Sequence, residues 1–76
     1  MKYQLLLFES THQVLKAELI LKGACIRHEI IPTPKEISSD CGVSVRIPFE
    51  AFDAEKTADL MASAKLNYRL EEKEMR

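Results

Sequence analysis

The chain has 76 residues, of which 46% are hydrophobic and 30% are charged, and its formal net charge at pH 7 is −1. This balance is typical of a single globular domain over residues 1–76, with a thin core, because a chain this short buries only about 60% of its unfolded surface. A net charge near zero gives no general attraction to nucleic-acid phosphates, and no apolar run approaches the roughly 20 residues that cross a bilayer, so neither nucleic acid nor a membrane is an expected partner.

The first predicted elements are a strand and a helix. Tyr3 to Phe8 form an apolar run of strand length. Ser10, followed three residues later by Gln13, is a capping-box signature for a helix start, and Gly23 is a typical helix stop. Between them, apolar residues recur at helical spacing, namely Val14, Ala17, Ile20 or Leu21, and Ala24.

Two further strands are predicted in the middle of the chain. Residues 27–31 form the first of these, which Pro32 ends. Residues 43–47 form the next, and in it Ser44 and Arg46 alternate with apolar side chains. This alternation predicts that one face of the strand is exposed to water.

The last predicted elements are a second helix and a fourth strand. The helix runs from about Phe49 or Asp53 to Ala64, with Asp53 as a candidate cap, and its inner face is expected to carry Ala54, Ala58, Met61 and Ala64 or Lys65. In the strand, Leu66, Tyr68 and Leu70 alternate with polar residues, and the charged tail 71–76 is expected to fray.

The predicted order β-α-β-β-α-β is that of an α+β ferredoxin-like fold, a four-stranded antiparallel sheet with two helices on one face. Right-handed crossovers place the start of the first helix and the loop between Pro32 and Gly42 at the same edge of the sheet. Cys41 and His12, which are far apart in sequence, are therefore expected to be neighbours.

The first strand also predicts an interface. Leu5, Leu6, Leu7 and Phe8 place large apolar side chains on both faces of the sheet, whereas the helices cover only one face. An exposed apolar stripe usually marks a contact surface. We therefore expect a homodimer that packs through the open sheet face.

The connection from Pro32 to Gly42 is the candidate functional segment, because hairpin loops usually need only about two to five residues. Pro32 and Pro34 stiffen its start, and Gly42 permits a tight turn before the third strand. Ser38, Ser39 and Asp40 are short polar residues that bond to nearby backbone amides and would hold Cys41 at the turn.

A cysteine reacts as its thiolate, so Cys41 needs neighbours that favour the anion. The amino end of the first helix, with Ser10 and Thr11, and the cations His12, Lys35 and Arg46 are candidates, whereas Asp40 opposes them. The local residues leave two readings of Cys41 equally open: a reactive thiol, or a small buried side chain under the loop. Taken by itself, His12 is more typical of a solvated histidine on the surface than of a residue that activates the Cys41 thiol.

The remaining polar residues suggest no cofactor and no metal. Cys25 lies at a helix-to-strand junction and is interpreted as a buried structural residue. Cys25 and His28 have the spacing of half a zinc site, but no second pair follows. Both cysteines are expected to be free thiols in a cytoplasmic protein, and no phosphate loop or nucleophile elbow supports an ordinary enzyme.

Several segments together resemble a known family. They are Phe8 to His12, Leu15 with Ala17 and Glu18, Ile31 to Gly42, and Arg46, and the most specific is the stretch Pro-x-Pro-(Lys/Arg)-Glu-Ile-Ser-x-x-Cys-Gly. The chain is similar, over nearly its whole length, to the family described as putative selenium/sulfur carrier protein-like. The resemblance implies that Cys41 bears the transferred atom, and Cys25 matches no part of the motif.

Three functional hypotheses follow. The leading one is a carrier or accessory protein, not an enzyme by itself, that holds sulfur or selenium on Cys41 as a persulfide-type adduct and binds a donor or acceptor protein. The second is a non-catalytic dimeric binding or regulatory module in which Cys41 only shapes the loop. The third is a thiol-disulfide protein that uses Cys25 with Cys41.

Overall fold

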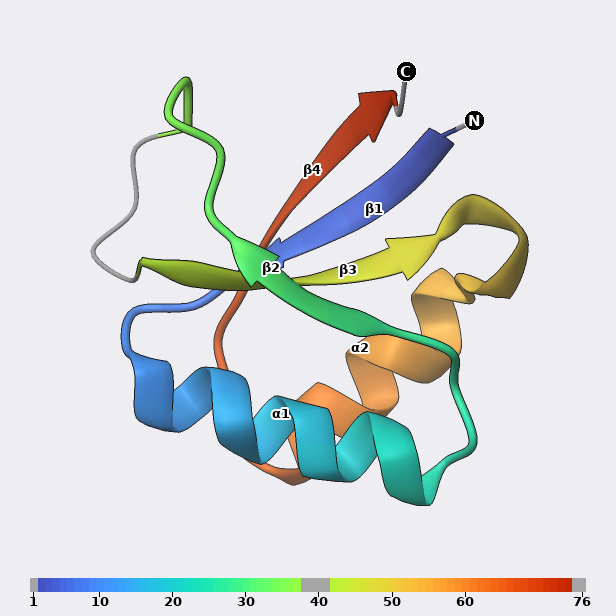
Figure 1. Cartoon of the computed structure of the whole chain (residues 1–76). Coiled ribbons are helices and arrows are strands. Elements are labelled where there is room, and N and C mark those ends of the chain that lie inside the picture. The colour runs from blue at the N-terminus through green and yellow to red at the C-terminus, as the bar shows by residue number, and fades with distance from the viewer. Residues whose placement is uncertain (1, 38–41, 75–76) are drawn as a thin grey trace.

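The computed structural model describes residues 2–37 and 42–74, and Figure 1 shows a sheet with both helices on one side. The strand order is β2-β3-β1-β4, and all neighbouring strands are antiparallel. This arrangement confirms the ferredoxin-like prediction. No helix in the described ranges is long and apolar enough to span a membrane. The elements are β1 Lys2–Leu7, α1 Thr11–Gly23, β2 Glu29–Pro32, β3 Val43–Pro48, the 3-10 helix η1 Phe49–Ala51, α2 Ala54–Ser63 and β4 Arg69–Glu74.

The hydrophobic core fills the space between the sheet and the two helices. α1 contributes the side chains at helical spacing that the sequence predicted, Val14, Ala17 and Leu21, and all three are fully buried. The inner face of α2 differs from the prediction, because Thr57 and Met61 are buried whereas Ala54 and Ala58 are exposed. Asp53 caps α2 one residue before Ala54, and this start sets which positions of the helix face the sheet.

Two strand boundaries also differ from the prediction. β2 is shifted toward the loop and includes Pro32, which pairs with Val43. β4 begins only at Arg69 and continues to Glu74, so the expected fraying of the tail is wrong for 71–74. These charged residues pair with residues 2–5 of β1, because strand pairing needs backbone groups and not apolar side chains.

Both helices end in a left-handed residue that is not glycine. After α1, the amide of Ile26 donates to the carbonyl of Leu21 at 2.9 Å and that of Cys25 donates to Lys22 at 3.1 Å, which is a Schellman motif. Cys25 has a φ of 59° there, and Lys65 has a φ of 58° at the same position after α2. α1 ends at Gly23 as predicted, but the left-handed residue of the motif is Cys25 and not a glycine. Cys25 is exposed, so the prediction that it is buried was wrong.

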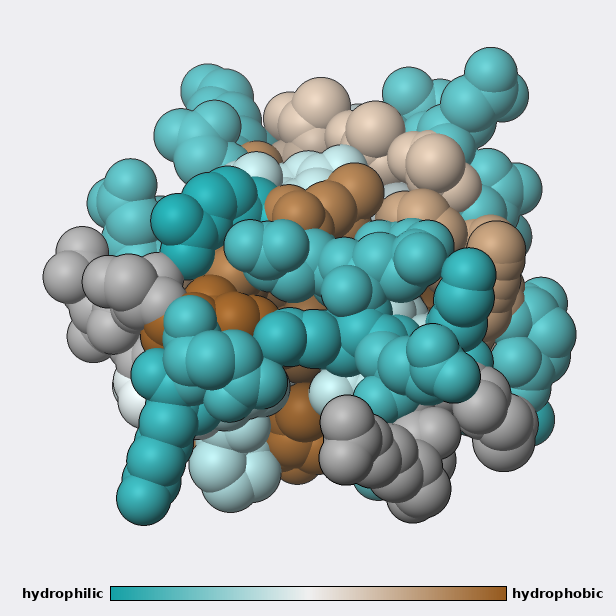
Figure 2. Space-filling model, turned by 90° about the horizontal axis from the view of Figure 1, so that it is seen from above, coloured by the Kyte–Doolittle hydropathy of each residue, from teal (hydrophilic) through white to brown (hydrophobic). Residues whose placement is uncertain are grey.

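The open face of the sheet does not expose the apolar stripe that the sequence predicted. Leu5 is 0% exposed and Leu7 is 4% exposed within the single chain. Leu5 lies between Arg46 and Glu71, whose long side chains share its face, and most side chains that Figure 2 draws on this face are hydrophilic. Ser44, expected to be wet, is also fully buried. The premise for a homodimer through this face is therefore wrong.

Candidate functional site

The loop between β2 and β3 is closed by two hydrogen bonds at its base. The amide of Thr33 donates to the carbonyl of Gly42 at 3.0 Å, which extends the β2–β3 ladder by one pair. The hydroxyl groups of Thr33 and Ser44 lie 2.6 Å apart and share a hydrogen bond. Because Ser44 is buried, this bond satisfies a hydroxyl that would otherwise be costly to bury.

The first half of the loop is also bound to the opposite edge of the sheet. The amide of Ile37 donates to the carbonyl of Pro34 at 3.0 Å and closes a turn, and Lys73 of β4 donates to Glu36 at 3.0 Å. β2 and β4 are the two outer strands, so this ion pair holds the turn folded back over the open face. The Glu36 backbone amide first, and Lys73 second, lower the pKa of the Glu36 carboxyl below its usual 4.5.

The central residues of the predicted site, Ser38, Ser39, Asp40 and Cys41, lie outside the described residues. The structure does describe the residues on either side of them, Ile37 and Gly42. The predicted contact between Cys41 and His12 therefore stays a prediction, as does any activation of the thiol.

The residues at the start of α1 do lie at the edge where the loop begins and ends. In the strand register Leu6 pairs with Val45, so the chain leaves β1 at the level where β3 begins just after Gly42. Ser10 caps α1 by accepting a hydrogen bond from the amide of Gln13 at 3.3 Å. Thr11 and His12 are exposed in the first turn, and that turn carries no acidic residue.

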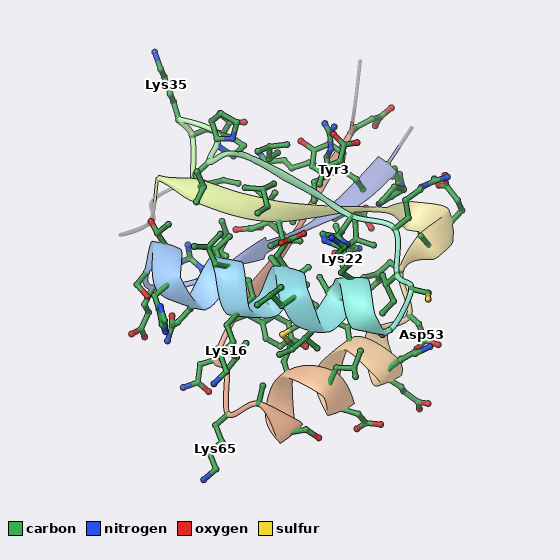
Figure 3. The ribbon with its side chains drawn as sticks, turned by 60° about the horizontal axis from the view of Figure 1, so that its bottom comes forward. Tyr3, Lys16, Lys22, Lys35, Asp53 and Lys65 are labelled. Atoms are coloured by element: carbon green, nitrogen blue, oxygen red, sulfur yellow. The ribbon has the colours of Figure 1, made fainter. Side chains whose placement is uncertain are left out.

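In the described part of the chain, Lys35 and Arg46 do not lie with Ser10, Thr11 and His12 at the start of α1. Figure 3 shows the Lys35 side chain directed away from the body of the molecule. Arg46 lies in the middle of β3, where its guanidinium donates to Glu29 at 2.7 Å and lies 5.4 Å from the centre of the Tyr3 ring. The guanidinium of Arg46 is therefore bound on the open face, and its predicted role beside the thiol stays a prediction.

Cys25 lies at the other end of α1. Its neighbours in a shallow groove include Arg27, Glu50 and Lys56, and Arg27 forms an ion pair with Glu50. The 13 residues of α1 separate this groove from the loop by roughly 20 Å at the usual rise of an α-helix. Figure 1 shows the two ends of α1 at opposite sides of the molecule, with the start of β3 on the side of its first turn.

His28, the other half of the spacing that resembles a zinc site, is bound within the chain. Its Nδ1 lies 2.7 Å from the carbonyl oxygen of Ile26 and its Nε2 lies 3.3 Å from a carboxylate oxygen of Glu18. Within residues 2–37 and 42–74, no group of three or more His, Cys, Asp or Glu side chains is arranged to hold a metal ion.

Sequence reasoning missed two features of this site. It treated Ser44 as a residue of a wet face, and it assigned no structural role to Glu36, whereas both bind the loop to the sheet. Thr33 directly follows β2 and Ser44 is the second residue of β3, and a short hydroxyl side chain on each side of the loop is the signal that could have paired them. Nothing in the sequence places Lys73 near Glu36, because the pairing depends on the direction of the turn.

Fold and loop together define a class: a small α+β domain of ferredoxin-like topology that holds an extended β2–β3 loop at one edge of its sheet. Residues 2–70 match the model of the family described as Putative Se/S carrier protein-like, and the chain belongs to this family. No curated protein and no solved structure matches the chain.

Proposed function

We propose that the protein carries a sulfur or selenium atom on Cys41 and transfers it between a donor and an acceptor protein. The observation that carries this proposal is the family match, which covers residues 2–70 and so includes the whole loop. The binding of the loop to the sheet through Thr33, Ser44 and Lys73 supports it, because a carrier thiol has to be presented at a defined place.

The proposed transfer is an exchange between thiols and involves no net oxidation. The Cys41 thiolate attacks the outer sulfur of a donor persulfide, the donor S–S bond breaks, and its electron pair leaves on the donor thiolate. Cys41 then holds the atom as a persulfide, and an acceptor thiolate attacks the same atom and releases the Cys41 thiolate. A selenium atom follows the same steps.

The start of α1 is the proposed source of thiolate stabilisation. The amino end of this helix carries the partial positive charge of the helix dipole, and no acidic residue in the first turn offsets it. His12 would add charge when protonated, and Thr11, Lys35, Arg46, Ser38, Ser39 and Gly42 would position the loop. Asp40 within the loop acts in the opposite direction.

The test is to incubate the protein with glutathione persulfide and to measure its mass. The wild-type chain and Cys25→Ser should gain about 32 Da, the mass of one sulfur atom, and Cys41→Ser should not. Iodoacetamide titration across pH on the same variants then reports how much of Cys41 is thiolate at neutral pH. An adduct that persists in Cys41→Ser, or a Cys41 that reacts no faster than a model thiol, would overturn the proposal and favour a binding module.

A further inference from the structure

The two helices expose outer faces of opposite character. α1 exposes Leu15 and Leu19, 51% and 67% accessible, together with Lys16. Its one acidic residue, Glu18, is half-buried and contacts His28. Figure 3 shows the Lys16 side chain directed away from the sheet, on the outer side of α1. This face is therefore bulky, apolar and basic.

The outer face of α2 is acidic and built from small residues. Glu55 and Asp59 are exposed one turn apart, and the exposed residues around them include Ala58, Ala62 and Ser63. A shallow groove runs along this face, with Leu60 among its apolar lining and Asp53, Glu55 and Asp59 among its acidic residues. Lys56 also lines the groove and reduces its negative charge. Large apolar side chains beside Lys16 on α1 thus complement a groove with acidic sides on α2.

We propose that the helix layer is an interface between two copies of this chain, in which α1 of each copy packs into the α2 groove of the other. α1 and α2 run in opposite directions beside one another (Figure 1), so a two-fold axis parallel to them sets α1 against the partner's α2 in antiparallel packing. The alternative two-fold sets α1 against α1 and brings Lys16 toward its own copy. Charge therefore selects the first arrangement.

The size of the helix layer is sufficient for such an interface. The chain is a slab of 30 × 27 × 16 Å, and the helix layer forms one of its broad faces. A standard interface needs about 800 Å² from each partner, which is the order of area that this face offers. The interface also removes Leu15 and Leu19 from water, and they are the most exposed leucines of the described chain.

The experiment is sedimentation equilibrium of the wild-type chain and of two charge reversals, Lys16→Glu and Asp59→Lys. The wild type should be a dimer at micromolar concentration, and each reversal should weaken the dimer at least tenfold, because each places like charges across both halves of the interface. An equimolar mixture of the two variants should restore the dimer as a heterodimer, since the carboxylate introduced into α1 of one copy would then face the ammonium group introduced into α2 of the other.

Two further variants control the test. Lys35→Glu removes a lysine that points away from the body of the molecule, and it should leave the dimer unchanged. Leu19→Glu changes a residue that makes little contact in the monomer, so the chain should stay folded by circular dichroism while the dimer is lost. A wild type that is monomeric up to about millimolar concentration, or a mixture that fails to restore the dimer, overturns the proposal.

Discussion

At the scale of single residues, Cys25 occupies a conformation that suits glycine. A residue with a side chain pays about 1 kcal/mol to adopt a left-handed φ, and Cys25 has a φ of 59°. Cys25→Gly should therefore raise the free energy of unfolding by about 0.5–1 kcal/mol, as measured by urea denaturation. Lys65→Gly provides a matched variant with a φ of 58° and should behave in the same way. A loss of stability in both variants would contradict the assignment of the Schellman motif.

Thr57 is a second residue whose local chemistry costs stability. Its side chain is 0% exposed, and its hydroxyl has no hydrogen-bond partner among the described residues. Thr57→Val replaces that hydroxyl with a methyl group of similar size, so it should raise the free energy of unfolding by about 1 kcal/mol. Thr57→Ser keeps the hydroxyl but removes a methyl group, and it should lower stability instead. Equal stability of the Val variant and the wild type would show that the hydroxyl is satisfied in solution.

At the scale of elements, the ion pair between Glu36 and Lys73 makes the position of the β2–β3 turn depend on pH. The pKa of Glu36 is lowered in the folded chain, so the stabilisation is present above 4.5 and is lost as the pH falls through the lower, folded value. A ¹³C NMR titration of the Glu36 carboxyl should show this lowered pKa in the wild type. In Lys73→Met the pKa should rise part of the way back, because the backbone hydrogen bond of Glu36 is the larger cause and remains. An unchanged titration in Lys73→Met would mean that the pair does not form in solution.

At the scale of the whole molecule, the fold separates Cys25 from Gly42, the chain neighbour of Cys41. Gly42 directly precedes β3, which begins on the side of the first turn of α1, whereas Cys25 follows the last turn of α1. Adjacent Cα atoms are about 3.8 Å apart, and a disulfide needs Cα atoms closer than about 7 Å. We therefore expect no internal disulfide between Cys25 and Cys41, and the hypothesis of a thiol-disulfide protein stays a prediction to be tested.

Dilute oxidation tests this separation. When the protein is treated with diamide at low concentration, the monomer should contain no internal disulfide, and any oxidised product should be mixed or intermolecular. Non-reducing peptide mapping by mass spectrometry distinguishes these products, and Cys25→Ser serves as the control. A Cys25–Cys41 peptide pair in the monomer fraction would show that the chain departs from this topology.

The sequence by itself determined the order of elements, the N-caps at Ser10 and Asp53, and the family, because each depends on neighbouring residues or on a contiguous motif. It misjudged β4, because strand pairing uses backbone groups and charged side chains do not prevent it. It also misjudged Leu5, Leu7 and Ser44, since their burial depends on long side chains and a turn from other parts of the chain.

Only the tertiary structure decided how the loop is held and which surfaces stay open. Glu36 meets Lys73, 37 positions further along the chain, because the turn folds back over the sheet. Thr33 meets Ser44 diagonally, because the register places Ser44 opposite Ile31 and Thr33 lies two residues beyond Ile31. The physical reason is the same in each case. Contacts between residues that are far apart in sequence depend on how each helix or strand is oriented relative to the preceding one. Local patterns in a sequence do not encode that orientation.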